Sequence, residues 1–165
     1  KLYKRIKEKT LMIKINLISK NKSLESYIKN PSYFFKNQTK KFNKKFKKYY
    51  KRKIFCTLLL SGDKEIKILN KKFRKKNKST DVLSFPFYNK KELRIKLKKD
   101  KEIYLGDIII NLNKIKSKNN KIDFKLALNK LWIHGLVHLF GYDHKKENDF
   151  YSMRKVEKRF LSYLS

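Results

Sequence analysis

All three histidines of this 165-residue chain lie in one short segment, H-G-L-V-H-L-F-G-Y-D-H, residues 134–144. An α-helix turns about 100° per residue, so His134 and His138 project from one face, one turn apart, as two ligands of one metal ion must. His144 cannot reach that face if the helix continues. Gly141 resolves this, because glycine takes the left-handed conformation that ends helices and lets the chain turn back. The spacing therefore predicts a metal site formed by His134, His138 and His144.

The ligand set indicates which metal this site prefers. Three neutral imidazoles without cysteine or carboxylate favour one zinc ion per chain over nickel, copper or iron. Three protein ligands leave a fourth coordination position open, which is typical of catalytic rather than structural zinc. Asp143 has two interpretations: an acceptor that orients a ligand histidine, or an aspartate that caps the turn before His144.

The same histidine spacing occurs in the metzincin peptidases, so a metallopeptidase is the first alternative. Those enzymes carry a glutamate directly after the first histidine, where it acts as general base. This chain has Gly135 there. Met153 lies downstream, as a Met-turn would require, but its helical pattern favours a core position. Without the glutamate, the site keeps a Lewis acid and loses the group that handles protons in peptide cleavage.

Two further blocks accompany the histidines: L-N-K-K-F-R-K-K-N-K-S-T-D-V-L-S-F-P-F at 69–87 and L-G-D-I-I-I-N at 105–111. In order and spacing, the three blocks resemble the YbeY family, bacterial zinc-dependent endoribonucleases of ribosomal RNA maturation. The resemblance covers about residues 54–160. It implies that the three histidines bind zinc and are catalytic, and that Arg74 is the functionally required arginine. Ser79 and Val137 depart from the proline and leucine usual at their positions, and the serine is expected to make its loop less rigid.

The resemblance implies a single metal-dependent hydrolase domain over 1–165 that cuts single-stranded RNA, in particular ribosomal RNA, in maturation and ribosome quality control. Small-subunit ribosomal proteins are candidate partners. Arg74 would hold a phosphate oxygen through paired charge-assisted hydrogen bonds. The nucleophile, an activated water or the adjacent 2′-hydroxyl, stays open. A second alternative is a non-catalytic ribosome assembly factor with a structural zinc.

Composition agrees with a polyanionic partner. Lys+Arg of 46 against Asp+Glu of 14 gives a net charge of +32. Forty of these cations are lysine and Ala127 is the single alanine, a usage typical of AT-rich genomes, so we assign the excess about equally to base composition and to nucleic-acid binding. Cys56, alone in an apolar run, is predicted to be buried; a single cysteine fits a cytoplasmic location. No signal peptide or membrane span is expected, since the apolar stretch 11–18 is broken by Lys14.

Hydrophobic periodicity predicts an α/β layered fold, a small mixed sheet of about four strands packed with helices, with the metal site at the end of a central helix. The expected strands are 11–18, 54–60, 81–87 and 104–111. Helices are expected within 33–52, through the segment of Ile66, Leu69 and Phe73 that ends at Arg74, through the first two histidines, and over 145–164. Residues 89–101 are expected to form a charged loop. Pro86 indicates an edge or an end of its strand.

Several local details complete the expectation. Ser61 or Asp63 is the candidate N-cap of the helix that ends at Arg74, and Asp123 that of the histidine helix. The aromatic residues within 33–52 are interpreted as core packing in preference to an RNA-stacking platform. They are Phe35, Phe42, Phe46 and Tyr49. The metal site at the end of the histidine helix is expected to face the strand that carries the Thr80–Asp81 loop and to form a cleft with it.

Overall fold

A computed structural model describes residues 13–19, 27–49, 51–116, 120–144 and 147–165. The strands are β1 (Ile13–Ser19), β2 (Lys53–Ser61), β3 (Val82–Pro86) and β4 (Glu102–Asn111). The helices are α1 (Pro31–Lys45), α2 (Asp63–Arg74), α3 (Lys90–Lys99), a 3₁₀ turn η2 (Leu112–Lys114), α4 (Lys121–Leu139) and α5 (Glu147–Ser162). Residues 11–12, 50 and 145–146 of the expected elements lie outside the described residues. Within the described part, no helix is both long and apolar enough to cross a membrane.

The four strands form one mixed sheet in the order β1-β2-β4-β3, which confirms the predicted α/β fold. β1, β2 and β4 are parallel, and β3 runs antiparallel to β4, with Ser84 opposite Ile108. β3 is an edge strand and ends at Pro86, as the proline predicted. Proline lacks the N–H that an inner strand would need for its ladder.

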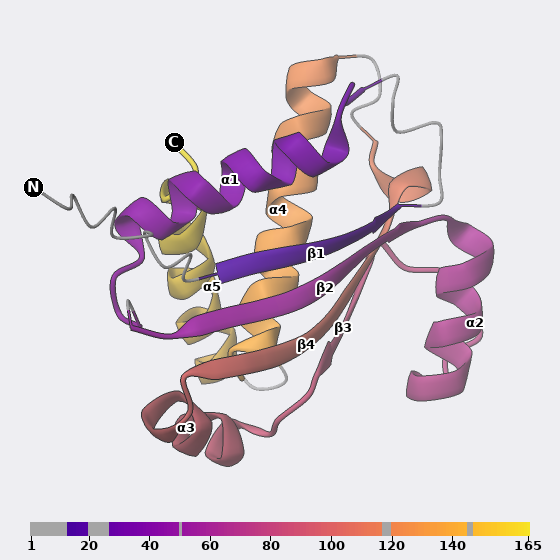
Figure 1. The fold of residues 1–165 in the computed structure, drawn as a ribbon. Coiled ribbons are helices and arrows are strands. Elements are labelled where there is room, and N and C mark those ends of the chain that lie inside the picture. Colours follow the sequence, from indigo (N-terminus) through magenta and orange to yellow (C-terminus); the bar gives the residue numbers. More distant parts are fainter. Residues whose placement is uncertain (1–12, 20–26, 50, 117–119, 145–146) are drawn as a thin grey trace, which may run out of the picture.

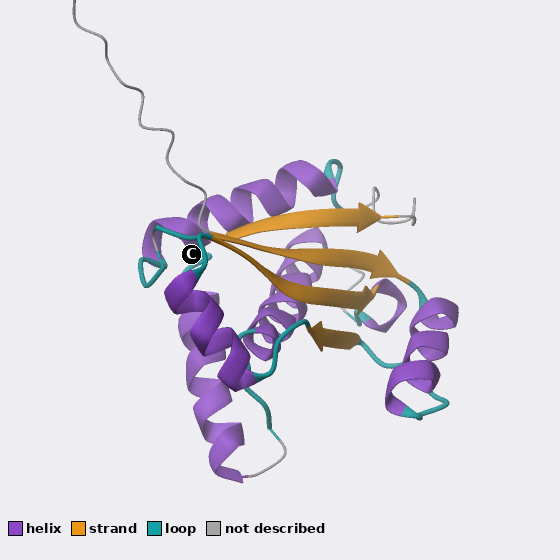
Figure 2. Ribbon diagram, turned by 60° about the horizontal axis from the view of Figure 1, so that its bottom comes forward, coloured by secondary structure: helices purple, strands orange, loops and turns teal. Residues whose placement is uncertain are grey.

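The two faces of the sheet are covered differently. Alternate residues of β2 and β4, such as Leu58 and Ile108, join the main core with α1, α4 and α5, and α4 passes behind the sheet in Figure 1. The opposite face carries a small cluster of Ile66 from α2 with Leu83 and Ile109. Figure 2 shows α2 standing apart from the three-helix side. Period-two alternation thus places α2 and α4 on opposite faces.

The aromatic residues of α1 and the segment after it belong to the core, as predicted, except at its rim. Phe35, Phe42 and Phe46 are buried, whereas Tyr49 is half-buried. α1 ends at Lys45 and does not extend to residue 52. It also begins earlier than expected, because the Asn30 side chain caps it and Pro31, whose missing N–H is not needed in the first turn, is its first residue.

Three sequence-based expectations about helix boundaries are wrong. Residues 89–101 are not a loop: α3 forms because Asn89 and Glu92 make a reciprocal capping box and Leu93 enters the core. The cap of α4 is Asn120, which accepts from Ile122 N, and Asp123 lies in the first turn. The cap position of α2 is Gly62, while the Ser61 hydroxyl donates to Glu65. In α2 and α4 the cap lies one to three residues from the expected one, a shift that periodicity does not resolve.

The loop before β3 is held by a hydrogen-bond network around Asp63. Its Oδ1 accepts from Ser79 Oγ at 2.6 Å and from Asn111 Nδ2 at 2.8 Å, and its Oδ2 accepts from Asn113 Nδ2 at 3.1 Å. Asn111 Nδ2 also donates to Ser79 Oγ at 2.9 Å. The expected loosening of the loop by Ser79 is therefore opposed by bonds that a proline at this position could not make. These contacts join the start of α2 to the end of β4.

Candidate metal centre

α4 carries the first two histidines at its carboxyl-terminal end. Its apolar residues, including Phe124, Leu128 and Trp132, are buried against the sheet and α1. Gly135 sets how closely the helix approaches β4, since a Cβ at this position would lie 2.6 Å from Cγ2 of Ile108. A larger side chain after His134 would point into the sheet. The glutamate that metzincin peptidases carry at this position therefore has no room here.

The helix ends as the glycine predicted. Gly141 has φ of +84°, its N–H donates to the carbonyl of His138 at 2.8 Å, and Tyr142 N–H donates to Val137 O at 3.3 Å. These bonds satisfy carbonyls of the last turn while the chain reverses direction. His144, three residues after Gly141, is thereby delivered beside the helix end.

The three imidazoles form a compact cluster. One ligand atom from each of His134, His138 and His144 lies within 4.8 Å of the others. Nε2 of His134 and Nε2 of His138 are 3.2 Å apart. Two nitrogens bound to one tetrahedral zinc ion, each about 2.0–2.1 Å from the metal, would be about 3.3 Å apart. The cluster therefore matches the size that a zinc ion requires.

The partners of the other ring nitrogens fix the tautomers. Nδ1 of His138 lies 2.9 Å from the carbonyl oxygen of Tyr142, which can only accept, so this nitrogen carries the proton. Nδ1 of His134 lies 3.3 Å from Oε1 of Glu157 and is assigned the proton for the same reason. With both rings in the neutral form that binds metal, the two Nε2 atoms carry lone pairs that face each other at short range. Such a pair is unfavourable by itself and suits a bound cation.

The electrostatics of the cluster keep His138 ready for metal. Burial, aided by the neighbouring His134, lowers the pKa of His138 from 6.5 to about 4. His138 is therefore neutral at physiological pH, and the neutral ring is the form that binds metal. The hydrogen bond with His134 lowers the pKa of the Glu157 carboxyl, so this group is an anion beside the cluster. A cation held by the histidines would therefore have a carboxylate hydrogen-bonded to one of its ligands.

The contacts of Asp143 favour its interpretation as an aspartate that caps the turn before His144. Its Oδ1 accepts from the backbone N–H of His144 at 2.8 Å, as an aspartate that orders a turn does. The aspartate therefore helps to hold the backbone of the third histidine in place.

The structure does not bring Arg74 into contact with the histidines. Arg74 is the last residue of α2 and is exposed, on the helix that covers the face of the sheet opposite α4. Among the described residues its guanidinium has no hydrogen-bond or ion-pair partner. The neighbouring Phe73 packs on Phe85 of β3 with ring centroids 5.1 Å apart. Arg74 and the histidine cluster thus belong to helices that cover opposite faces of the sheet.

Glu157 is the site residue that sequence reasoning missed. It lies on α5 between the buried Met153 and Phe160, four residues after one and three before the other. Positions so spaced share one face of a helix. An acidic residue on the inward face of an amphipathic helix was therefore the available signal. Met153 itself is in the core, as its helical pattern predicted.

The fold and the site together define a class of α/β domains with a three-histidine cluster, which could hold a metal ion, at the end of a central helix. Comparison with known proteins narrows this class. Residues 17–165 match the family described as Endoribonuclease YbeY, and the chain belongs to this family.

Individual relatives agree with that membership. The chain is 44% identical over 155 residues to Endoribonuclease YbeY of Pelagibacter ubique, which covers 93% of this chain and 97% of the relative. It is 33% identical over 114 residues to that of Thermodesulfovibrio yellowstonii, 67% of each chain. The solution structure of TM1509 from Thermotoga maritima has the same fold, with a TM-score of 0.56 at 21% identity over 92% of this chain and 89% of that one.

Proposed function

We propose that this chain is a zinc-dependent endoribonuclease that cuts single-stranded RNA. In this proposal one hydrolase domain spans residues 1–165 and acts in the cytoplasm on ribosomal RNA, during its maturation and in ribosome quality control. The observation that carries the proposal is the 3.2 Å approach of Nε2 of His134 to Nε2 of His138, with His144 beside them. Family membership supplies the reaction class.

Each residue of the cluster has a role in this proposal. His134, His138 and His144 would hold the metal, and the Tyr142 carbonyl and Glu157 would orient the first two rings. Zinc bound there would supply Lewis-acid activation of the scissile phosphate and of a water molecule, whose pKa falls to about 7 at such sites. The exposed His144 is the side from which substrate would reach the cluster, and three protein ligands would leave one coordination position for water or substrate.

Arg74 is proposed to hold the RNA strand across β3. The last turn of α2 contacts β3 through the Phe73–Phe85 ring pair. On the other face of the sheet, Gly135 of α4 packs on Ile108 of β4, which is paired with Ser84 of β3. An RNA strand that crosses this sheet edge would meet the histidines on one side and the guanidinium on the other. Paired hydrogen bonds from arginine to a phosphate suit this role.

The two alternatives make different demands on the site. A metallopeptidase would need a general base next to the first histidine, where the contact of Gly135 with Ile108 leaves no space. A non-catalytic assembly factor would use the metal only for folding and would leave RNA intact. We therefore retain the nuclease as the proposal, with small-subunit ribosomal proteins as candidate partners to be tested by co-sedimentation with small ribosomal subunits.

The deciding experiment combines metal analysis with cleavage. We expect about one zinc per chain, loss of zinc on His138→Ala because two imidazoles cannot hold the ion in a tetrahedral site, and cleavage of single-stranded RNA that chelator stops and added zinc restores. Casein should stay intact. Undiminished zinc in the His138→Ala variant would contradict the ligand set, and His134-dependent proteolysis would replace the nuclease by a peptidase. A substrate with one deoxynucleotide at the cleaved bond identifies the nucleophile.

A further inference from the structure

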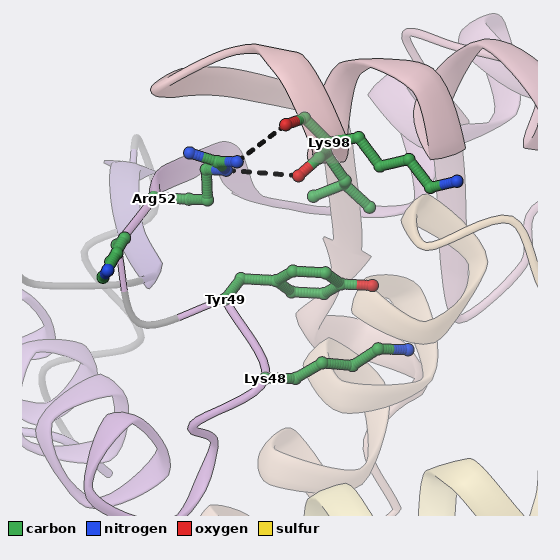
Figure 3. A pocket seen from close by; sticks show the side chains of 6 residues that line it. Lys48, Tyr49, Arg52 and Lys98 are labelled. Atoms are coloured by element: carbon green, nitrogen blue, oxygen red, sulfur yellow. Dashed lines mark hydrogen bonds between the residues drawn. The ribbon is translucent and has the colours of Figure 1, made fainter.

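A basic cavity lies apart from the histidines, where the segment after α1 meets the end of α3. Its volume is about 360 Å³. Its lining residues are four cations, one tyrosine and one leucine: Lys48, Lys51, Arg52, Lys98, Tyr49 and Leu97. Figure 3 shows the Tyr49 ring with Lys48 on one side and Lys98 and the Arg52 guanidinium on the other. No acidic residue is among the described residues that line it, so the cavity suits an anion that also carries an apolar ring.

Arg52 gives the cavity its shape. Its Nε donates to Leu97 O at 3.2 Å and its second terminal nitrogen donates to Lys98 O at 2.7 Å, as the dashed lines in Figure 3 show. Both carbonyls belong to the last turn of α3, and the carboxyl-terminal end of a helix carries partial negative charge. Since Arg52 satisfies them with two of its five N–H groups, the ammonium groups of Lys48 and Lys98 are not needed there.

Tyr49 supplies a flat, rigid wall. Its ring stacks on Phe140 with centroids 6.3 Å apart and planes 13° apart, and the Lys48 ammonium lies 5.2 Å from its centroid. Three other aromatic residues of this region are buried, whereas Tyr49 is half-buried and lines the cavity. An aromatic ring beside basic side chains is how proteins bind single-stranded nucleic acid without sequence preference, because every base has a π-face.

The cavity is connected to the metal centre through rigid elements. Phe140, which supports Tyr49, is the C-cap of α4, two residues after His138. At the other end of α3, Lys90 lies against Gly141, since a Cβ on the glycine would be 3.3 Å from Cγ of Lys90. The ten residues of α3 span roughly 15 Å at 1.5 Å each. That length corresponds to about four stacked nucleotides at roughly 3.4 Å each.

We propose that this cavity is a second RNA-binding site, which holds single-stranded RNA about four nucleotides from the bond that is cut. One base packs on Tyr49, and the phosphates beside it contact Lys48 and Lys98. The relation to a cut bond rests on the proposed nuclease function, whereas binding at the cavity needs no metal. The two ideas can therefore fail separately.

The test is RNA affinity of the full chain carrying His138→Ala, so that no cleavage occurs, measured by fluorescence anisotropy with a uridine 12-mer at several salt concentrations. Lys48→Gln with Lys98→Gln should lower the slope of log affinity against log salt by about 1.4, since each phosphate contact to a single strand contributes about 0.7. The matched control is Lys36→Gln with Lys40→Gln on the exposed side of α1, which removes the same charge and should change the slope by less than half as much.

The ring is tested separately. Tyr49→Leu should weaken 12-mer binding roughly 5-fold or more, while Tyr49→Trp, which keeps a stacking surface, should bind within about twofold of the parent. Thermal melting identifies a variant that has lost its fold, and the tryptophan substitution still tests the proposal in that case. Equal losses in the cavity and control lysine variants, or a Tyr49→Leu variant with parental affinity, would overturn the proposal.

Cleavage by the chain with its native histidines distinguishes the two proposals. The cavity lysine variants should raise KM for the 12-mer several-fold at unchanged kcat, and should leave a trimer, which is too short to span both sites, unaffected. Cavity-dependent binding without any zinc-dependent cleavage would remove the nuclease proposal and keep this one.

Discussion

Oε1 of Glu157 on α5 lies 3.3 Å from Nδ1 of His134 on α4, although the two residues are 23 positions apart in the chain. The carboxylate accepts a hydrogen bond from Nδ1–H of His134, whose Nε2 is directed at His138. This contact makes α5 part of the candidate metal centre, although α5 contributes none of the three histidines. It also leads to a first prediction.

Glu157→Gln should weaken zinc binding by about 10- to 100-fold, because outer partners of ligand histidines typically contribute that much to metal affinity. The glutamine keeps the volume and removes the charge. Competition with a fluorescent chelator measures the affinity. Asp149→Asn, an exposed acid on the same helix, is the control and should stay near the parent value. Equal affinities for the two variants would show that Glu157 does not orient the ring.

Gly135 should not tolerate even a methyl group. Glycine to alanine inside a helix normally stabilises by about 1 kcal/mol. Here the new Cβ would meet the buried, branched Ile108 at 2.6 Å, and overpacking of this kind typically costs about 1–3 kcal/mol. We expect Gly135→Ala to lower the free energy of unfolding, measured by urea denaturation.

A double-mutant cycle isolates the cause. Ile108→Ala should cost less in the Gly135→Ala background than in the parent, because the methyl group then occupies part of the vacated space. Additive effects of the two substitutions would rule out the contact as the reason. The same steric limit is why Gly135→Glu should not create a peptidase.

The site and the fold differ in how far they can be predicted from the chain alone. The histidine cluster depends on a local period of 3.6 residues and on one glycine, so His134, His138, Gly141 and His144 are readable from spacing. Glu157 and the Tyr142 carbonyl belong to the centre through tertiary packing or through a turn's hydrogen bond. Spacing contains no information on either contact.

For the fold, the strands were predictable because β-branched and apolar runs are strong local signals. α3 was not predicted, because its sequence is mostly lysine and Leu93 is its one buried residue, so it lacks a clear hydrophobic period. Its start depends instead on the capping box of Asn89 and Glu92. The exact N-cap residues were not predicted either, because asparagine, serine and aspartate all suit that position and tertiary contacts select among them. Asp63, an expected cap, instead accepts hydrogen bonds from Ser79 of the loop before β3 and from Asn111 at the end of β4.

Asp63 should give the protein an acid-sensitive step. The hydrogen bond from Ser79, together with those from Asn111 and Asn113, lowers the pKa of this carboxyl from 3.8 to about 2. A group whose pKa is lower in the folded state stabilises fully above its unfolded pKa and stops doing so as the pH falls through its folded pKa. Part of the stability should therefore disappear between about pH 4 and pH 2.

Urea denaturation across that range tests this step. Asp63→Asn should be less stable than the parent at pH 6 and should approach it near pH 2, and Ser79→Ala should raise the pKa of Asp63 toward its ordinary value. Asp149→Asn serves as the exposed control without these hydrogen bonds. A difference between parent and Asp63→Asn that is constant with pH would mean that the network does not act through the charge.

Arg74 should behave differently from the general positive charge of the surface. Arg74→Ala should leave the fold and the zinc content unchanged, because the side chain is exposed and lies away from the ligands. If the guanidinium holds a phosphate of the strand that crosses β3, the single-turnover rate at saturating RNA should fall roughly 10²-fold or more, with only a modest loss of affinity. Arg74→Lys should restore little, since an ammonium cannot make the planar two-point contact.

Lys71→Ala, in the same exposed last turn of α2, is the matched control. It should lower RNA affinity, reduce the slope of log affinity against log salt by at most about 0.7, and leave the saturated rate unchanged. An Arg74→Ala variant that matches this control would make Arg74 one more basic surface residue.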